Sequence, residues 1–130
     1  MSRPTILCVD DEPLVLASLG AQLRRAFGAR YALETADSAE AALELVDELC
    51  AEGVRLLVIV SDWLMPGVRG DELLVRVHVR HPDVVTVLLT GQADGASVER
   101  ARRDARLAAC LSKPWDEAEL VRVITENLRP

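Results

Sequence analysis

Acidic side chains follow two apolar runs of this chain, and a hydroxyl and an amine follow two others. Asp10 and Asp11 come directly after the first run, and Asp62 ends another. Thr90 and Lys113 stand at the ends of two further runs. If these runs are parallel strands, their carboxyl ends lie along one edge of the sheet, where such folds bind ligands. Converging carboxylates repel one another unless a cation joins them, so the pattern predicts a divalent-metal site beside a phosphate-sized anion.

The types of ligand indicate magnesium rather than zinc. Asp10, Asp11 and Asp62 offer only oxygen atoms, and Mg²⁺ prefers oxygen ligands, keeps several waters and shares phosphate groups. The sequence contains no set of cysteines and histidines with the spacing of a zinc site. Each acid taken alone also fits a solvated loop that caps the next helix. Their combination at neighbouring strand ends favours the metal.

Lys113 stands immediately before Pro114. Peptide bonds before proline are the ones that adopt the cis form, and a cis bond here would turn the chain sharply. That bend would direct the ammonium group back over the acids. The alternative is a surface lysine in a turn. Thr90 has two interpretations as well: a β-branched residue that ends a strand, or a hydroxyl that donates to a phosphate oxygen.

Strands and helices alternate five times along the chain. The strands are predicted near residues 5–10, 30–35, 56–61, 84–89 and 107–111. They are short and mostly apolar, as a sheet that is covered on both faces requires. Residues 31–35 alternate between apolar and polar, which is typical of an edge strand. With right-handed crossovers, the pattern predicts an α/β fold: a doubly wound (βα)5 domain whose five-stranded parallel sheet belongs to a single domain, residues 1–130.

Local signals mark where each helix begins and ends. The first helix is predicted from Pro13 to Gly28, and the third from Gly70 to before Pro82. The second begins at the capping pair Asp37 and Glu40, and the fifth begins at Asp116 with Glu119 in capping position. The fourth covers residues 94–106. Apolar spacing predicts that the second helix buries Ala39, Leu43, Val46 and Cys50. We find no repeat or linker that divides the chain.

The composition narrows the class of protein. Half of the 130 residues are hydrophobic, which is typical of a globular domain. The formal net charge of −6 argues against direct binding of nucleic acid, and no apolar run approaches the roughly 20 residues of a membrane helix. Cys8, Cys50 and Cys110 show no CxxC spacing, so we expect buried, reduced thiols in a cytoplasmic protein.

Taken together, the chain resembles the receiver domain of response regulators in two-component signalling. The matching elements are Asp10-Asp11, Asp62 with Met65-Pro66 and Gly70, Thr90-Gly91, and Lys113-Pro114. The resemblance covers essentially the whole chain, and this set in this order is highly specific. It implies a flavodoxin-like sheet with strand order 2-1-3-4-5 and helices on both faces.

The resemblance also implies a role for each acid. Asp62 matches the phosphoacceptor. Asp11 and Asp62 would hold Mg²⁺ directly and Asp10 through water, and the backbone carbonyl of Leu64 would complete the protein ligands. The domain would be a phosphoacceptor with self-catalysed transfer and slow autodephosphorylation rather than a turnover enzyme.

Thr90 and Lys113 complete the set that the resemblance implies. Thr90 would bind a phosphoryl oxygen, and Lys113 would pair with the phosphoryl charge. The phosphoryl donor would be the phosphohistidine of a sensor histidine kinase or a phosphotransfer protein. Phosphorylation would then switch the domain between an inactive and an active conformation, and we expect the loop after Thr90 to carry the change.

Two positions depart from the family pattern. Cys110 stands three residues before Lys113, where the family usually carries tyrosine or phenylalanine, so an aromatic ring cannot follow the movement of Thr90. Leu64, two residues after Asp62, is apolar where many members are polar. That side chain borders the path of the hydrolytic water, and an apolar group there predicts slow autodephosphorylation.

Three other classes are weighed against this interpretation. A haloacid-dehalogenase-type phosphatase needs a second aspartate two residues after its nucleophile, where this chain has Leu64. An FMN-binding flavodoxin needs phosphate-binding Ser, Thr and Gly in its first loop, where Asp10 and Asp11 would repel phosphate. The main alternative is a pseudo-receiver, an interaction module without phosphoryl turnover. The intact acid set argues against it, and Cys110 is in its favour.

Partners follow from the family analogy more than from the residues. The face formed by the fourth helix, the fifth strand and the fifth helix is the expected contact for an output domain or effector. A homodimer is an alternative use of the same surface. No nucleic acid or membrane contact is expected.

Overall fold

The computed structural model describes residues 3–91 and 95–128, and their strands form a parallel sheet. The strands are β1 (Thr5–Val9), β2 (Ala32–Ala36), β3 (Leu56–Asp62), β4 (Val85–Thr90) and β5 (Ala109–Ser112). The helices are α1 (Pro13–Phe27), α2 (Ala39–Ala51), α3 (Gly70–Arg80), α4 (Gly95–Asp104) and α5 (Glu117–Asn127), and a short 3-10 helix, η1 (Gly28–Arg30), follows α1. The five strands lie in the order β2-β1-β3-β4-β5, as predicted.

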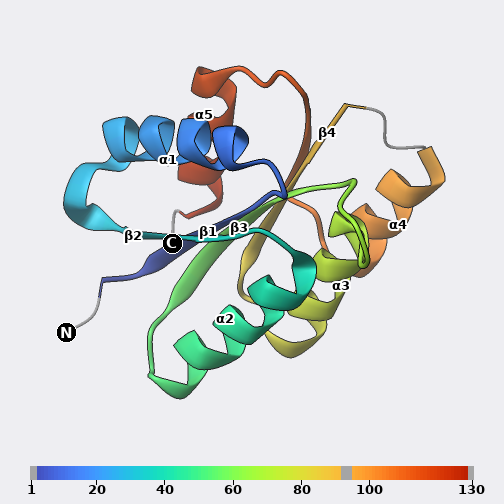
Figure 1. Cartoon of the computed structure of the whole chain (residues 1–130), viewed down its shortest axis with the longest axis horizontal. Helices are drawn as coiled ribbons and strands as arrows, with labels where there is room; N and C mark the ends of the chain where they lie inside the picture. Colours follow the sequence, from blue (N-terminus) through green and yellow to red (C-terminus); the bar gives the residue numbers. More distant parts are fainter. Residues whose placement is uncertain (1–2, 92–94, 129–130) are drawn as a thin grey trace.

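Helices cover both faces of this sheet (Figure 1). α1 and α5 pack together on one face, and α2, α3 and α4 lie on the other. This arrangement confirms the doubly wound α/β fold. None of the helices in the described ranges has the length and apolarity needed to cross a bilayer.

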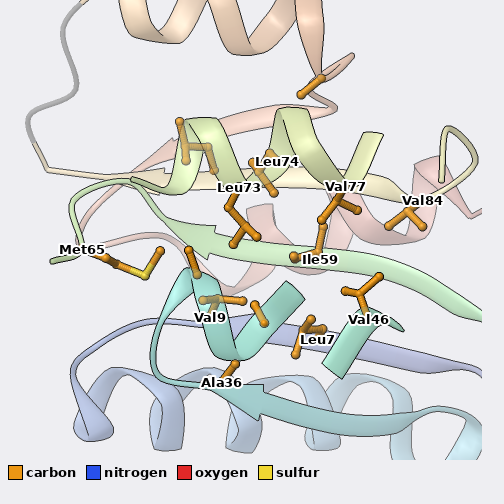
Figure 2. Close-up of a cluster of buried hydrophobic side chains, with 14 residues drawn as sticks. Leu7, Val9, Ala36, Val46, Ile59, Met65, Leu73, Leu74, Val77 and Val84 are labelled. Atoms are coloured by element: carbon orange, nitrogen blue, oxygen red, sulfur yellow. The ribbon is translucent and has the colours of Figure 1, made fainter. Parts of the chain in front are cut away.

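Successive strand residues point to opposite faces, so each strand contributes to two cores. Leu7 and Val9 of β1 belong to the core beneath α2 and α3, which also contains Leu74 (Figure 2). Ile6 and Cys8 belong to the second core, beneath α1 and α5. All five side chains are at most 1% exposed. Burial on both faces explains why the central strands are continuous apolar runs rather than alternating ones.

The predicted strands are confirmed within two residues at each end. The largest differences are two residues, at β2, which begins at Ala32 rather than 30, and at β5, which begins at Ala109 rather than 107. Arg106 adopts a φ angle of 49° between α4 and β5, and this left-handed turn delays the start of the strand. β2 is an edge strand as predicted, and its Glu34 and Thr35 are exposed.

The predicted capping of α2 is wrong by one residue. The helix begins at Ala39, and its N-cap is Ser38 rather than Asp37. The Ser38 hydroxyl accepts a hydrogen bond from the backbone N–H of Ala41 at 3.0 Å. A serine hydroxyl satisfies this otherwise unpaired donor as well as an aspartate does, so local spacing did not distinguish the two candidates.

The buried face of α2 is also rotated from the predicted one. Its buried residues are Ala39, Ala42, Val46 and Leu49. Leu43 is only half-buried, and Cys50 is exposed, so the prediction of three buried thiols is wrong for Cys50. Apolar residues of α2 extend beyond its buried face, so apolar spacing alone does not decide which of them meet the sheet.

The two ends of the described chain lie at the amino ends of the strands. Pro4, just before β1, and Leu128, just after α5, line the same surface cleft. Arg55 and Val84, which precede β3 and β4, line it as well. This cleft is at the edge of the sheet opposite the one where Asp62 ends β3.

We expect the three cysteines to react with a thiol reagent in the order of their exposure. Cys50 is exposed, Cys110 is half-buried and Cys8 is buried. The thiolate is the reactive form, and burial raises the pKa of Cys8 to about 12 and also raises the pKa of Cys110. At a pH near the ordinary thiol pKa of about 8.5, Ellman's reagent should modify Cys50 first and Cys110 more slowly. Cys8 should react only in denaturant. If the native protein rapidly releases three equivalents of the coloured thiolate from the reagent, this order is wrong.

Candidate functional site

The acids predicted from the sequence meet at the carboxyl edge of the sheet. Asp10 and Asp11 follow β1, and Asp62 is the last residue of β3, the neighbouring strand. One ligand atom from each of the three carboxylates can be chosen so that all lie within 4.8 Å of one another. Asp10 is fully buried and Asp62 is 6% exposed, whereas Asp11 is exposed. The structure therefore gathers three oxygen ligands at a point that solvent reaches from one side.

Lys113 supplies the positive charge between the two buried acids. Its Nζ lies 2.9 Å from Asp10 Oδ2 and 3.0 Å from Asp62 Oδ1. The remaining oxygen of Asp10, Oδ1, accepts a hydrogen bond from the backbone N–H of Glu12 at 2.9 Å. Both oxygens of the fully buried Asp10 thus have a donor, as a buried carboxylate requires.

The electrostatics of the site are those of crowded acids with one cation. Burial raises the pKa of Asp62 most, the charges of Asp10 and Asp11 raise it further, and the hydrogen bond from Lys113 lowers it. For Lys113, burial alone would lower the pKa, but the hydrogen bonds and charges of Asp10 and Asp62 outweigh burial, so its pKa is raised. Lys113 therefore stays protonated between the two acids.

The end of β5 directs Lys113 toward the acids. The backbone N–H of Lys113 donates a hydrogen bond of 3.0 Å to the carbonyl of Thr90, at the end of β4. The Lys113–Pro114 peptide bond is cis, one of the two alternatives that the sequence left open. The indole N–H of Trp115 then donates to Gln22 Oε1 of α1 at 2.7 Å, which ties the segment after the lysine to the opposite helix.

Backbone hydrogen bonds close the loop between β3 and α3. The N–H of Trp63 donates to the carbonyl of Leu89 (3.0 Å), and the N–H of Gly70 donates to the carbonyl of Trp63 (2.7 Å). A β-carbon at Gly70 would overlap the carbonyl oxygen of Asp62, so only glycine fits there. Leu64 lies in this loop, two residues after Asp62, and is 65% exposed.

This donor set fits Mg²⁺. Carboxylate oxygens with open space for water are the environment that Mg²⁺ accepts, and the described residues bring neither cysteine nor histidine into the cluster. Of the predicted residues, Asp10, Asp11, Asp62 and Lys113 are brought together, and Thr90 ends the adjacent strand β4. Leu64 lies in the loop that follows Asp62.

A group of charged residues at the start of α3 was not predicted from the sequence. Asp71 in the first turn of α3 is 1% exposed and pairs with Arg69 at 3.2 Å. Glu72 pairs with Arg100 of α4 at 2.6 Å. An acid directly after Gly70 at a helix start was the available signal, but nothing local distinguishes a buried Asp71 from an exposed one.

A comparison with known families identifies the chain. The family profile of the response regulator receiver domain matches residues 6–125. The chain belongs to this family. Receiver domains are phosphoacceptor signalling domains of two-component systems, and they bind Mg²⁺ at an acidic pocket of the kind described above.

Relatives and solved structures agree with this assignment. The receiver domain is 32% identical over 124 residues to the sensor kinase CckA of Brucella abortus and 30% identical over 124 residues to the hydrogenase transcriptional regulatory protein HoxA of Cupriavidus necator. Each match covers 95% of this chain but only 12% of CckA and 24% of HoxA, so the chain spans a small part of these relatives.

Among solved structures, the signal receiver domain of an HD domain-containing protein from Pseudomonas fluorescens Pf-5 is 31% identical, with a TM-score of 0.85, over 97% of this chain and 94% of that one. A CheY-like receiver domain protein from Methanospirillum hungatei JF-1 is 27% identical, with a TM-score of 0.83, over 98% and 94% of the two chains.

Replacing Gly70 by alanine tests the closure of the β3–α3 loop. The new β-carbon forces the Asp62 carbonyl to move, and overpacking of this kind costs about 1–3 kcal/mol. We expect Gly70→Ala to lower the free energy of unfolding by that amount in urea titrations. As a control, Gly20→Ala in α1 places its β-carbon 3.4 Å from the flexible Arg24 side chain and should leave stability unchanged or raised. If Gly70→Ala and Gly20→Ala change the free energy of unfolding equally, the close approach of Gly70 to Asp62 is wrong.

Proposed function

We propose that this receiver domain accepts a phosphoryl group on Asp62 from the phosphohistidine of a sensor histidine kinase or a phosphotransfer protein, in a reaction that requires Mg²⁺. The observation that carries the proposal is the meeting of Asp10, Asp11 and Asp62 within 4.8 Å, with the Lys113 ammonium 3.0 Å from Asp62. A nucleophilic carboxylate, a set of oxygen ligands and a cation then share one site.

In the proposed step, one Asp62 oxygen bonds to phosphorus while the bond between phosphorus and the donor's imidazole nitrogen breaks. The electron pair of that bond returns to the imidazole. Transfers of this kind need positioning and neutralisation of charge more than covalent assistance. Lys113 already bridges Asp10 and Asp62 and would pair with one phosphoryl oxygen. The hydroxyl of Thr90, at the end of β4, would donate a hydrogen bond to a different phosphoryl oxygen.

The metal would be held by Asp11, Asp62 and the backbone carbonyl of Leu64, with Asp10 acting through water. When bound, Mg²⁺ neutralises the charge on the reacting phosphoryl oxygens. The burial of Asp10 beneath Lys113 and the Glu12 N–H supports an indirect role for that acid. The exposure of Asp11 supports a direct one, because this carboxylate can reach the solvent-facing side of the cluster.

The proposed output is a shift of population between two conformations. Reversing a 1:99 equilibrium to 99:1 needs about 5.5 kcal/mol of differential binding. Charge-assisted hydrogen bonds of roughly 1.5–3 kcal/mol each, from Thr90 and Lys113, supply a total of that order. The loop after Thr90 is our candidate for the responding segment, and its residues 92–94 lie outside the described residues.

The remaining parts of the proposal concern organisation and partners. The two cores run across the whole sheet, which supports one receiver domain over residues 1–130. The face of α4, β5 and α5 is the proposed contact for an output domain, an effector or a second copy. The greater length of CckA and HoxA supports a role in which such a domain works together with other modules.

The proposal predicts two successive changes in tryptophan fluorescence. Trp63 adjoins Asp62, so we expect a saturable response to Mg²⁺ and a second response when beryllofluoride, a phosphoryl mimic, is added. Asp62→Asn should abolish the second response, because it removes the carboxylate that beryllofluoride binds. Treatment with acetyl phosphate should add the mass of one phosphoryl group to the wild type and none to the variant.

The same experiment separates the pseudo-receiver from the working phosphoacceptor. Mg²⁺ binding without any beryllofluoride response, together with unchanged mass after acetyl phosphate, would support an interaction module. Cys110 in the usual aromatic position is the feature that favours this alternative.

Leu64 predicts a long-lived phosphoryl group. The side chain is 65% exposed in the loop after Asp62 and cannot orient a water molecule by hydrogen bonding. We expect Leu64→Asn to accelerate loss of phosphate from Asp62 several-fold, measured by the decay of the phosphorylated mass after the phosphodonor is removed. Leu14→Asn is the matched control, because Leu14 is also exposed, at 84%, but on α1. A wild-type half-life of seconds would count against this role of Leu64.

A further inference from the structure

A hydrogen bond between two side chains ties the segment between β5 and α5 to α1. The indole N–H of Trp115 donates to Gln22 Oε1 at 2.7 Å. Both side chains are half-buried, and the Trp115 ring packs against the core beneath α1 and α5. The amide nitrogen of Gln22 donates to the hydroxyl of Ser18, one turn earlier, at 3.4 Å. The amide oxygen is therefore the atom that faces the indole, and it satisfies the polar group of a ring that is otherwise packed on apolar side chains.

This anchor lies close to Lys113 in the chain. Only Pro114 separates Lys113 from Trp115. The pyrrolidine ring fixes the φ angle of proline, so the linking residue has one soft backbone dihedral where other residues have two. On its other side, the Lys113 backbone is held by its N–H, which donates to the carbonyl of Thr90. Anchoring Trp115 therefore restricts the position from which the Lys113 side chain starts.

The α1 end of the anchor leads back to the acids. Glu12 is the N-cap of α1, and its backbone N–H donates to Asp10 Oδ1 at 2.9 Å. The other oxygen of Asp10 lies 2.9 Å from Lys113 Nζ. These contacts form a closed ring, which runs from Asp10 along α1 to Gln22. From there it crosses to Trp115 and returns to Asp10 through Lys113.

We propose that Gln22 and Trp115 are positioning residues that hold the Lys113 ammonium in place beside Asp62. This inference rests on the proposed function, in which that ammonium pairs with a phosphoryl oxygen on Asp62. A lysine has a flexible four-carbon stem, so its ammonium can reach many positions unless the backbone that carries it is fixed. The hydrogen bond between Trp115 and Gln22 supplies a fixed point on the α1 side. Without it, the ammonium is still present but less accurately placed.

Removing the acceptor tests this role. Gln22→Met keeps the length of the side chain but replaces the amide oxygen by a thioether, which is a weak acceptor. We expect it to weaken the binding of beryllofluoride in the presence of Mg²⁺ by about threefold to tenfold, the factor that corresponds to one hydrogen bond. Trp115→Phe keeps an aromatic ring without the N–H and should have the same effect. The double variant should bind no more weakly than either single one. Tryptophan fluorescence measures the affinity, and Trp63 remains as the reporter in Trp115→Phe.

Control variants separate positioning from a general loosening of α1 and α5. Arg25 of α1 pairs with Glu117 of α5 at 2.7 Å, and both side chains are largely exposed. This exposed ion pair joins the same two helices, and Arg25→Met should leave the affinity within about twofold of the wild type. Gln22→Glu keeps an oxygen acceptor at the same reach and should retain the affinity to the same extent. In the background of Lys113→Met, Gln22→Met should change the affinity by less than about twofold, because no ammonium is left to position.

The outcomes distinguish the positioning role from the proposed function. If Gln22→Met weakens binding no more than Arg25→Met does, or equally in the Lys113→Met background, the positioning role is wrong and the phosphoacceptor stands. If the wild type does not bind beryllofluoride, the proposed function is wrong.

The positioning role is then judged by the free energies of unfolding in urea, which also carry the test if Lys113→Met binds too weakly to measure. Gln22→Met and Lys113→Met must be non-additive, whereas Arg25→Met and Lys113→Met must be additive. Additivity in both pairs contradicts the positioning role.

Discussion

The repulsion between carboxylates at the carboxyl edge of the sheet constrains the rest of the structure. Asp10 and Asp62 are buried side by side, and two like charges cannot stay there without a cation between them. Lys113 is that cation, and it comes from the far edge strand β5. The position of the Lys113 ammonium depends on the strand order, on the length of β5 and on the turn at Pro114.

The fold separates stability from chemistry. The two cores on either face of the sheet are apolar and involve none of the acids, whereas the reactive groups stand on the ends of strands that those cores hold rigid. Gly70 is where the two requirements meet, because the first turn of α3 packs so closely against Asp62 that a side chain has no room. Substitutions at most exposed positions away from the site can therefore leave its geometry intact.

Features that depend on short-range chemistry were predictable from the sequence. Apolar runs gave the strands, and the acids, threonine and lysine at their ends gave the members of the candidate site. The buried face of α2 was not predictable to one residue, because Leu43 and Leu49 are both apolar and spacing alone does not decide which of them meets the core. The burial of Asp71 is accompanied by its ion pair with Arg69, and no pattern in the chain reports this pair or a contact between α3 and α4.

Pro4 and Leu128 lie together at the amino ends of the strands, at the opposite edge of the sheet from Asp62. Polypeptide joined to either end of the described chain leaves from this remote edge, so it need not cover the acids. An affinity tag or a fluorescent protein fused at either end should therefore leave the approach of a phosphodonor open. For the same reason, a receiver of this architecture can be inserted between other domains of a longer protein while its reactive edge remains accessible.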